Sequence, residues 1–340
     1  MRGALATARS VMTSFRTMGL RSLTVLLAPA LVVVAACSSS TTASSPTPSN
    51  ADAGVDATVA RDDVRFVALG DTGKGNAGQK AVAAAMATKC AASGCDFAVL
   101  LGDNIYESGI SSPDDPEMQS KFEDIYAALD MDFQIVLGNH DYGGQGYGNE
   151  FDKAAHEVAY SAKSKKWKLP APHYRFQKTH VDFFVLDTNL MMYSRDAAQK
   201  TDVAGWLAES KAPWKIALGH HPYKSNGPHG NAGTYDGLSD GSTFSGKGVQ
   251  TFMDDIVCGK VDLYLSAHDH SLQWPTDTCK GTALAVSGAG ASPTTLSPKN
   301  PTKFETTKLG FLYVTLTKTS LTAEFIDETG ASLHTEKLSK

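Results

Sequence analysis

From Val64 onward, short apolar runs rich in β-branched residues alternate with segments in which apolar residues recur every three or four positions. The first pattern predicts buried strands, and the second predicts amphipathic helices. The expected strands are 64–69, 97–101, 133–137, 174–178, 181–186, 214–218, 261–266, 283–287, 311–316 and 321–326. The expected helices are 77–92, 116–129, 151–161, 202–210 and 247–257.

The order of these elements predicts an α/β fold. The early strands alternate with helices, which favours parallel pairing through right-handed crossovers. The strands 311–316 and 321–326 are separated by only four residues and should form an antiparallel hairpin. We therefore expect a mixed α/β domain with two sheets covered by helices. Long loops are expected at 226–246, rich in Gly and Ser, and at 288–308, rich in Pro and Thr.

Five short polar blocks each follow directly on an apolar run. They are Gly70-Asp71-Thr72-Gly73, Gly102-Asp103-Asn104-Ile105-Tyr106, Gly138-Asn139-His140-Asp141, Gly219-His220-His221-Pro222 and Ala267-His268-Asp269-His270. The carboxyl ends of strands in an open α/β sheet are where ligands bind. One Asp after a strand is commonly a helix N-cap, and one His is more often structural, but the repetition favours converging metal ligands. Five such blocks supply enough oxygen and nitrogen donors for two metal ions.

Residues 1–37 have the composition of an export signal. Four arginines and no acid accompany a charge-free apolar run, 23–36, that is too short to be a membrane anchor. The run ends Val34-Ala35-Ala36-Cys37, which resembles a bacterial lipobox and implies that Cys37 is lipidated after cleavage. We expect an exported protein held in the bacterial cell envelope by a lipid anchor, periplasmic or at the surface. An ordinary signal of a secreted protein is the alternative.

The stretch 38–60 is rich in Ser, Thr, Ala and Pro and is expected to be a flexible linker, which leaves one folded domain at 61–340. The chain has a net charge of −5, and loss of the four signal arginines would make it −9. Because no Lys/Arg cluster offsets this charge, we expect no nucleic-acid partner. Contact with a membrane is expected only through the lipid anchor.

Four cysteines remain besides Cys37. An even number in an exported chain suggests two disulfides, although the sequence permits three connectivities. The local pairing Cys90–Cys95 and Cys258–Cys279 is preferred. A cysteine zinc site is the weaker alternative, since no CxxC spacing occurs.

The five blocks together resemble those of the metallophosphoesterase (calcineurin-like) superfamily. Tyr106, three residues after Asp103, makes them resemble the purple acid phosphatases, and the segments 159–175 and 286–290 are similar to the small tartrate-resistant members. The resemblance covers about residues 64–317. It implies an αββα sandwich of two mixed β-sheets flanked by helices, with 61–340 as the catalytic domain.

The resemblance also implies seven ligands for a dinuclear centre. They are Asp71, Asp103, Tyr106, Asn139, His220, His268 and His270. By this resemblance Asp71, Tyr106 and His270 would bind Fe³⁺. Asn139, His220 and His268 would bind a second, divalent metal (Fe²⁺, Zn²⁺ or Mn²⁺), and Asp103 would bridge the two. The chemistry agrees, because trivalent iron prefers anionic oxygen while neutral amide and imidazole ligands suit the divalent ion.

His140 and His229 are the candidate catalytic residues. His140 adjoins Asn139, and His229 follows His220 by nine residues, as the matching histidine does in the family. Each could hydrogen-bond a phosphate oxygen or protonate a leaving alkoxide. A solvent-facing loop position is the alternative for His229. His221 is expected to form a wall of the pocket, and Asp269 to orient a histidine or cap a turn.

The function implied by the resemblance is hydrolysis of phosphate monoesters, with a metal-bound hydroxide as the nucleophile. The substrate would be a small phosphorylated molecule or a phosphoprotein, and the enzyme an acid phosphatase. A phosphodiesterase or nucleotide hydrolase on the same scaffold, or a non-catalytic surface lipoprotein, are the alternatives. Two features depart from the family pattern: Ala267 replaces a usual glycine, and 231–247 resembles an insertion. We expect this insertion to border the pocket and to set the substrate range.

Overall fold

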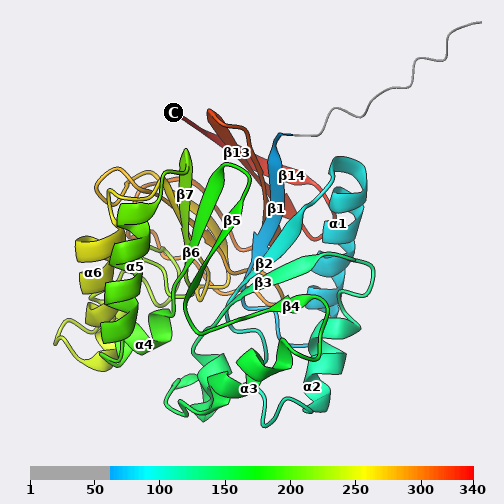
Figure 1. The fold of residues 1–340 in the computed structure, drawn as a ribbon, viewed down its shortest axis with the longest axis horizontal. Helices are drawn as coiled ribbons and strands as arrows, with labels where there is room; N and C mark the ends of the chain where they lie inside the picture. The colour runs from blue at the N-terminus through cyan, green and yellow to red at the C-terminus, as the bar shows by residue number, and fades with distance from the viewer. Residues whose placement is uncertain (1–61) are drawn as a thin grey trace, which may run out of the picture. The chain divides into compact units, whose positions relative to one another are not determined.

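The computed structural model describes residues 62–340, so the export signal and linker expected at 1–37 and 38–60 lie outside the described residues. Two seven-stranded mixed sheets form the domain (Figure 1). The first has the order β14 (Ser332–Ser339), β13 (Ser320–Asp327), β12 (Gly310–Leu316), β1 (Val64–Leu69), β2 (Phe97–Leu101), β3 (Asp132–Val136) and β4 (Trp167–Lys168). The second has the order β11 (Thr302–Thr306), β9 (Leu272–Pro275), β10 (Ala283–Ser287), β8 (Leu263–Ser266), β7 (Trp214–Leu218), β6 (Val181–Val185) and β5 (Tyr174–Lys178).

The two sheets pack face to face through aromatic side chains. Phe183 of β6 meets Phe66 of β1 edge-on, with ring centroids 5.5 Å apart, and meets Phe97 of β2 in the same way at 5.4 Å. All three side chains are fully buried. Because both faces of β1, β2 and β6 are covered, these strands consist of nearly continuous apolar runs, which is why the sequence predicts them well.

Helices cover the outer face of each sheet (Figure 1). Their bounds are α1 Ala77–Ser93, α2 Pro116–Met118, α3 Lys153–Tyr160, α4 Thr188–Met192, α5 Ala197–Glu209 and α6 Lys247–Phe252. Helix α1 packs Val82 and Met86 against the core of the first sheet. Helices α5 and α6 pack Val203 and Phe252 into a second cluster over the other sheet. The αββα sandwich expected from the resemblance is therefore confirmed.

Two expected helices are interrupted, and four strands were not predicted: β4, β9, β11 and β14. The helix expected at 116–129 passes from α2 into a π-helical turn, Gln119–Glu123, and then into turns, while Phe122, Tyr126 and Leu129 are buried. The helix expected at 247–257 likewise ends in a π-helical turn, Met253–Val257. The loop expected at 288–308 was wrong in part, because Thr302–Thr306 forms β11 against β9. Strands β11 and β14 lie at sheet edges and alternate polar with apolar residues, so neither contains the apolar run that predicts a buried strand.

The antiparallel pairing of β12 with β13 and both preferred disulfides, Cys90–Cys95 and Cys258–Cys279, are present as expected. The first disulfide joins the last turn of α1 to the approach to β2, and the second joins the end of the α6 segment to the approach to β10. Neither pair is left to bind zinc. Within residues 62–340 no helix has the length and apolar character needed to span a membrane.

Candidate dinuclear metal centre

The polar blocks lie where β1, β2, β3, β7 and β8 end, and their backbone is unusual. Asp71, Asp103 and His268 have φ values of 57°, 53° and 67°, in the left-handed region that non-glycine residues rarely adopt. Such strained positions cluster at functional sites. Glycines allow the blocks to approach one another closely: a Cβ at Gly102 would lie 2.5 Å from Nδ1 of His220, and one at Gly138 would lie 2.3 Å from Oδ1 of Asp103.

One group of donor atoms gathers around the Tyr106 hydroxyl. Its oxygen lies 3.0 Å from Oδ1 of Asp71, 3.0 Å from Oδ2 of Asp103 and 3.1 Å from Nε2 of His270. Ser292 contacts the other ring nitrogen of His270 at 3.1 Å, so Nε2 faces the group. These are the residues expected to hold the ferric ion, together with Asp103.

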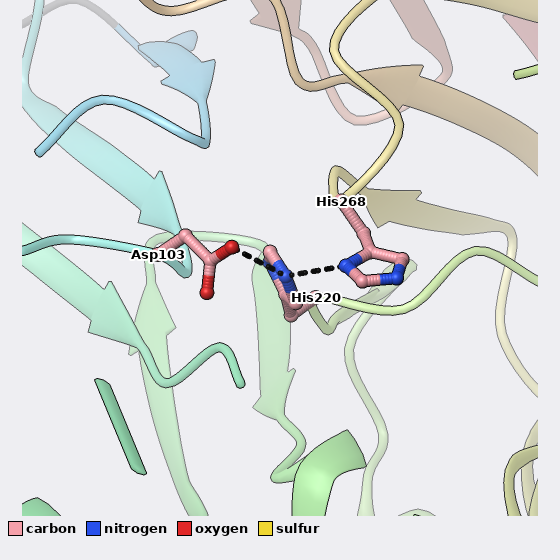
Figure 2. Close-up of side chains that lie close together, drawn as sticks. All are labelled: Asp103, His220 and His268. Atoms are coloured by element: carbon pink, nitrogen blue, oxygen red, sulfur yellow. Dashed lines mark hydrogen bonds and ion pairs between the residues drawn. The ribbon is translucent and has the colours of Figure 1, made fainter. Parts of the chain in front are cut away.

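A second group gathers around Nε2 of His220. This atom lies 3.0 Å from Oδ1 of Asn139, 3.1 Å from Nδ1 of His268 and 3.4 Å from Oδ2 of Asp103. Figure 2 shows Asp103 and His268 pointing at His220 from opposite sides. The carbonyl of Leu101 accepts from Nδ1 of His220 at 2.9 Å and fixes the orientation of the ring. Oδ2 of Asp103 therefore belongs to both groups, which is the position expected of a bridging ligand.

Each group contains more acceptors than protons, and this imbalance fits a cation. The phenol of Tyr106 has one hydrogen but faces two carboxylate oxygens and an imidazole nitrogen. Nε2 of His220 has at most one hydrogen and faces an amide oxygen, a carboxylate oxygen and a second imidazole nitrogen. A buried cluster of acceptors is costly unless a positive charge satisfies it, so the donor set fits two metal ions.

The pKa shifts of the metal-free cluster have the same origin. Burial opposes the charged form of His220, but the charge of Asp103 prevails and raises the pKa of His220 to about 9. Burial and the charges of Asp103 and Asp71 raise the pKa of Tyr106 well above its ordinary value. Burial and the neighbouring His229 and His221 lower the pKa of His268. Metal uptake should consequently displace protons from His220 and Tyr106.

His140 and His229, the two candidate catalytic residues, flank the donor groups in matching ways. Nδ1 of His140 bonds to the carbonyl of Glu107 at 2.6 Å, and Nε2 lies 4.0 Å from Oδ2 of Asp103. Nδ1 of His229 bonds to Oδ1 of Asp236 at 2.9 Å, and the ring packs 4.0 Å from that of His268. In both residues the bond at Nδ1 leaves Nε2 available. His229 therefore lies beside the donor groups, with 35% of its side chain exposed to solvent.

Two aspartates support the cluster without joining it. Asp269 accepts from the backbone N–H groups of His229 at 3.0 Å and Gly230 at 3.3 Å, and so performs the expected turn-capping role. Asp141 accepts from the N–H groups of Asn104 at 2.8 Å and Gly138 at 2.8 Å, and ties the end of β2 to the end of β3. Sequence reasoning assigned Asp141 no role, although it stands within one of the five polar blocks.

A pocket of about 240 Å³ opens beside the His220 group. Asn139, His268, His221 and His229 form its inner part, which confirms His221 as a wall residue. The loop that follows His229 contributes Tyr235, Asp236 and Phe244, so the insertion at 231–247 does border the pocket as expected. The sequence departure at Ala267 is also accommodated: a Cβ at Gly70 would lie 2.4 Å from Cβ of Ala267, so the absence of a side chain at Gly70 leaves room for the methyl group.

Comparisons with known proteins agree with this geometry. Residues 64–272 match the calcineurin-like phosphoesterase family. The chain is 29% identical to tartrate-resistant acid phosphatase type 5 of Sus scrofa, over 81% of this chain and 86% of that protein. It is 28% identical to purple acid phosphatase 4 of Arabidopsis thaliana, over 82% and 84%.

Solved structures share the fold. GAP50 of Plasmodium, described as the anchor in the inner membrane complex, superposes with a TM-score of 0.65 at 23% identity, covering 82% of this chain and 89% of that one. PhoD superposes with a TM-score of 0.56 at 14% identity, covering 82% and 69%.

Proposed function

The chain belongs to the calcineurin-like phosphoesterase family, and from that membership we propose that it is an acid phosphatase that hydrolyses phosphate monoesters at a dinuclear metal centre. The observation that carries the proposal is the convergence of seven donor side chains in two groups that share Oδ2 of Asp103. The fold alone would not suffice, because a structural neighbour is described as a membrane-complex anchor. The complete donor set favours an enzyme over a binding module.

The chain's own residues account for the steps around the phosphoryl group. When bound, two metal ions would supply Lewis acidity toward the phosphoryl oxygens and acidify the attacking water. Asp71, Tyr106 and His270 would hold one ion, Asn139, His220 and His268 the other, and Asp103 both. His140 and His229 each present Nε2 with Nδ1 anchored, so each can bond a phosphate oxygen or carry a proton to the leaving oxygen.

The metal identities form the finer part of the proposal. The group around Tyr106 combines two carboxylates with a phenol, which favours Fe³⁺, whereas the group around His220 favours Fe²⁺, Zn²⁺ or Mn²⁺. Metal analysis of the purified protein together with its visible spectrum tests this assignment. We expect one iron and one further metal per chain and a tyrosinate-to-iron charge-transfer band that Tyr106→Phe abolishes. Two zinc or two manganese ions with no such band would contradict the iron assignment.

The class of ester is tested by comparing a simple aryl phosphate monoester with the matching diester. Monoester turnover should exceed diester turnover by at least about tenfold, since a monoester offers one more free oxygen than a diester for His140 or His229 to bond. A preference for the diester would favour the phosphodiesterase alternative. Absence of both activities in protein loaded with two metals would favour the non-catalytic alternative.

We further propose that the mature protein is tethered by a lipid on Cys37. The support is the charge-free run that ends Val34-Ala35-Ala36-Cys37. Mass spectrometry of the mature amino terminus provides the test: we expect an acylated Cys37, and Cys37→Ser should release the protein from membranes. An unmodified amino terminus elsewhere would indicate a secreted protein.

A further inference from the structure

The outer part of the pocket beside the His220 group is formed by three aromatic side chains, Tyr147, Tyr193 and Phe244, here called the aromatic rim. Phe244 packs edge-on against Tyr147, with ring centroids 6.1 Å apart, and against Tyr193 at 6.2 Å. The rim unites segments distant in sequence: the turn after β3, the end of α4 and the insertion after His229. These rings lie over the mouth of the same cavity that Asn139 and His268 line from within.

The exposure of the rim is unusual for this molecule. Within residues 62–340, the large hydrophobic side chains that are exposed are Tyr147 at 64%, Phe244 at 43% and Leu238 at 38%. Two of the three line the pocket, and the third belongs to the same insertion. A group of exposed aromatic rings at the mouth of a polar site indicates a binding surface, because an apolar ligand that packs on the rings removes their apolar area from water.

The rim is held firmly in place relative to the donor groups. Nδ2 of Asn139 donates to the carbonyl of Gly146 at 2.8 Å, so a proposed metal ligand is bonded to the residue that precedes Tyr147. Gly146, with a φ of 87°, packs so closely on His140 that a Cβ would lie 2.7 Å from its ring. The hydroxyl of Tyr193 donates to the carbonyl of Tyr147. A group seated on the rim therefore has a defined position relative to the inner end of the pocket.

The chemistry of the walls favours a flat, uncharged group. The hydroxyl of Tyr235 donates to the carbonyl of Pro222, and Nδ1 of His221 bonds to Thr188 at 2.8 Å, so these polar atoms are engaged by the protein. Among the described residues that line the pocket, none is a lysine or an arginine, which disfavours a second phosphate group. A cavity of about 150 Å³ accommodates a benzene ring, and this pocket measures about 240 Å³.

From these observations we propose that the aromatic rim binds the aromatic group of an aryl phosphate monoester whose phosphoryl group lies at Asn139 and His268. The proposal rests on the proposed phosphomonoesterase function and adds the substrate class. An aryl ester places its ring directly on the ester oxygen, so a ring at the rim and a phosphoryl group at the inner end suit one small molecule.

The test compares binding of phenylphosphonate and methylphosphonate, which cannot be hydrolysed and therefore do not report the reactivity of a leaving group. Calorimetric titration of the metal-loaded full-length protein gives both dissociation constants. We expect tighter binding of phenylphosphonate to the wild type, and a preference reduced about three- to tenfold in Tyr147→Ala and in Phe244→Ala. Methylphosphonate affinity should change less than about twofold, because the phosphonate end does not meet the rim.

Matched variants separate the rim from general effects of the insertion. Leu238→Ala removes an exposed apolar side chain of the same insertion outside the pocket lining and should leave the preference unchanged. Tyr147→Phe retains the ring and should retain the preference. An unchanged preference in the Tyr147→Ala/Phe244→Ala double variant, or no preference in the wild type, would overturn the proposal. Turnover of a phosphate monoester by the same wild-type sample is measured alongside, so a failure of the proposed function is seen separately from a failure of the rim.

Discussion

The two sheets contribute different chemistry to the donor cluster. The first sheet supplies oxygen donors from the ends of β1, β2 and β3: Asp71, Asp103, Tyr106 and Asn139. The second supplies nitrogen donors from the ends of β7 and β8: His220, His268 and His270. Each group of donors nevertheless draws on both sheets, because His270 joins the group around Tyr106 and Asn139 joins the group around His220. The cluster therefore exists only where the two sheets are packed together, and metal ions would fasten them.

This division also places acids on one side of the interface between the sheets and histidines on the other. Burial opposes ionisation of Asp103, but His220 and His140 outweigh it and hold the pKa of Asp103 below its ordinary value. In the metal-free protein an acid of one sheet is thus paired with a histidine of the other, 3.4 Å apart. Metal binding would replace a cross-sheet ion pair by cross-sheet coordination. Weakening the contacts between the sheets one at a time tests this view.

The largest effect is expected from Asp103→Ala, because this carboxylate serves both donor groups. We expect loss of both metals, and loss of phosphatase activity by more than about 100-fold, since even partners that only support a metal ligand are worth 10–100-fold. Metal analysis and kcat/KM provide the measurement. Asp277→Ala, which removes an exposed acid paired with Lys224, is the control and should retain metals and activity. Full metal content in Asp103→Ala would exclude the bridging role.

Removal of the metals from the wild type should come next in size. If both ions join the sheets, a metal concentration 1,000 times the dissociation constant stabilises the fold by about 4 kcal/mol per site. Chelation should therefore lower the unfolding temperature markedly. His220→Ala, which keeps the Tyr106 group intact, should show a smaller decrease on chelation. An unfolding temperature insensitive to chelation would show that the donor groups do not fasten the sheets.

The ligand cluster could be predicted from sequence far better than its surroundings. Each block follows an apolar strand directly, so residues such as Asp71 and His220 are placed by the strand that precedes them. Asp141 was not assigned because its role depends on the N–H group of Asn104, 37 residues away in the sequence, as well as on that of Gly138 in its own block. The aromatic rim was out of reach for the same reason, since the contact of Tyr147 with Phe244 depends on how two irregular loops fold. The burial of a strand can be predicted from the residues of that strand alone, whereas contacts between loops depend on residues far apart in the sequence.

An intermediate effect on stability is expected from a contact between the two sheets that involves no proposed metal ligand. The hydroxyl of Tyr142, after β3, donates to the buried carboxyl of Asp187, after β6. Burial raises the pKa of Asp187 to about 6, although the bond from Tyr142 opposes this. A folded-state pKa above the unfolded value means that the folded protein binds the proton more tightly. The group therefore adds stability in acid, fully below about pH 4, and loses it as the pH rises through 6.

Asp187→Asn should remove this pH dependence. The difference between 3.8 and about 6 corresponds to about 3 kcal/mol. Denaturant unfolding of the metal-free protein between pH 4 and 7 should show a free energy of unfolding that falls with rising pH more steeply in the wild type than in the variant. Asparagine can still accept from the N–H of Leu190 at the start of α4, so the helix cap survives. Equal slopes in the two proteins would mean that Asp187 does not titrate as proposed.

The smallest effect is expected at the apolar contact between Gly70, after β1 of the first sheet, and Ala267, after β8 of the second. A Cβ at Gly70 would meet Cβ of Ala267 at 2.4 Å and Cβ of Leu101 at 3.1 Å, so Gly70→Ala should destabilise the protein by about 1–3 kcal/mol through overpacking. Ala267→Gly alone should cost less than about 1 kcal/mol. Because the closest of these contacts is with Ala267, the double variant should recover about 1 kcal/mol relative to the sum of the single effects.

This double-mutant cycle, measured by denaturant unfolding of the metal-free proteins, isolates the contact between the two sheets from metal binding. A favourable coupling would mean that Gly70 leaves the room that the methyl group of Ala267 occupies. The residual loss in the double variant should reflect the contact with Leu101, which Ala267→Gly cannot relieve. If the two single effects on the free energy of unfolding are strictly additive, the segments after β1 and β8 adjust independently. Only the donor groups would then join the sheets at this edge.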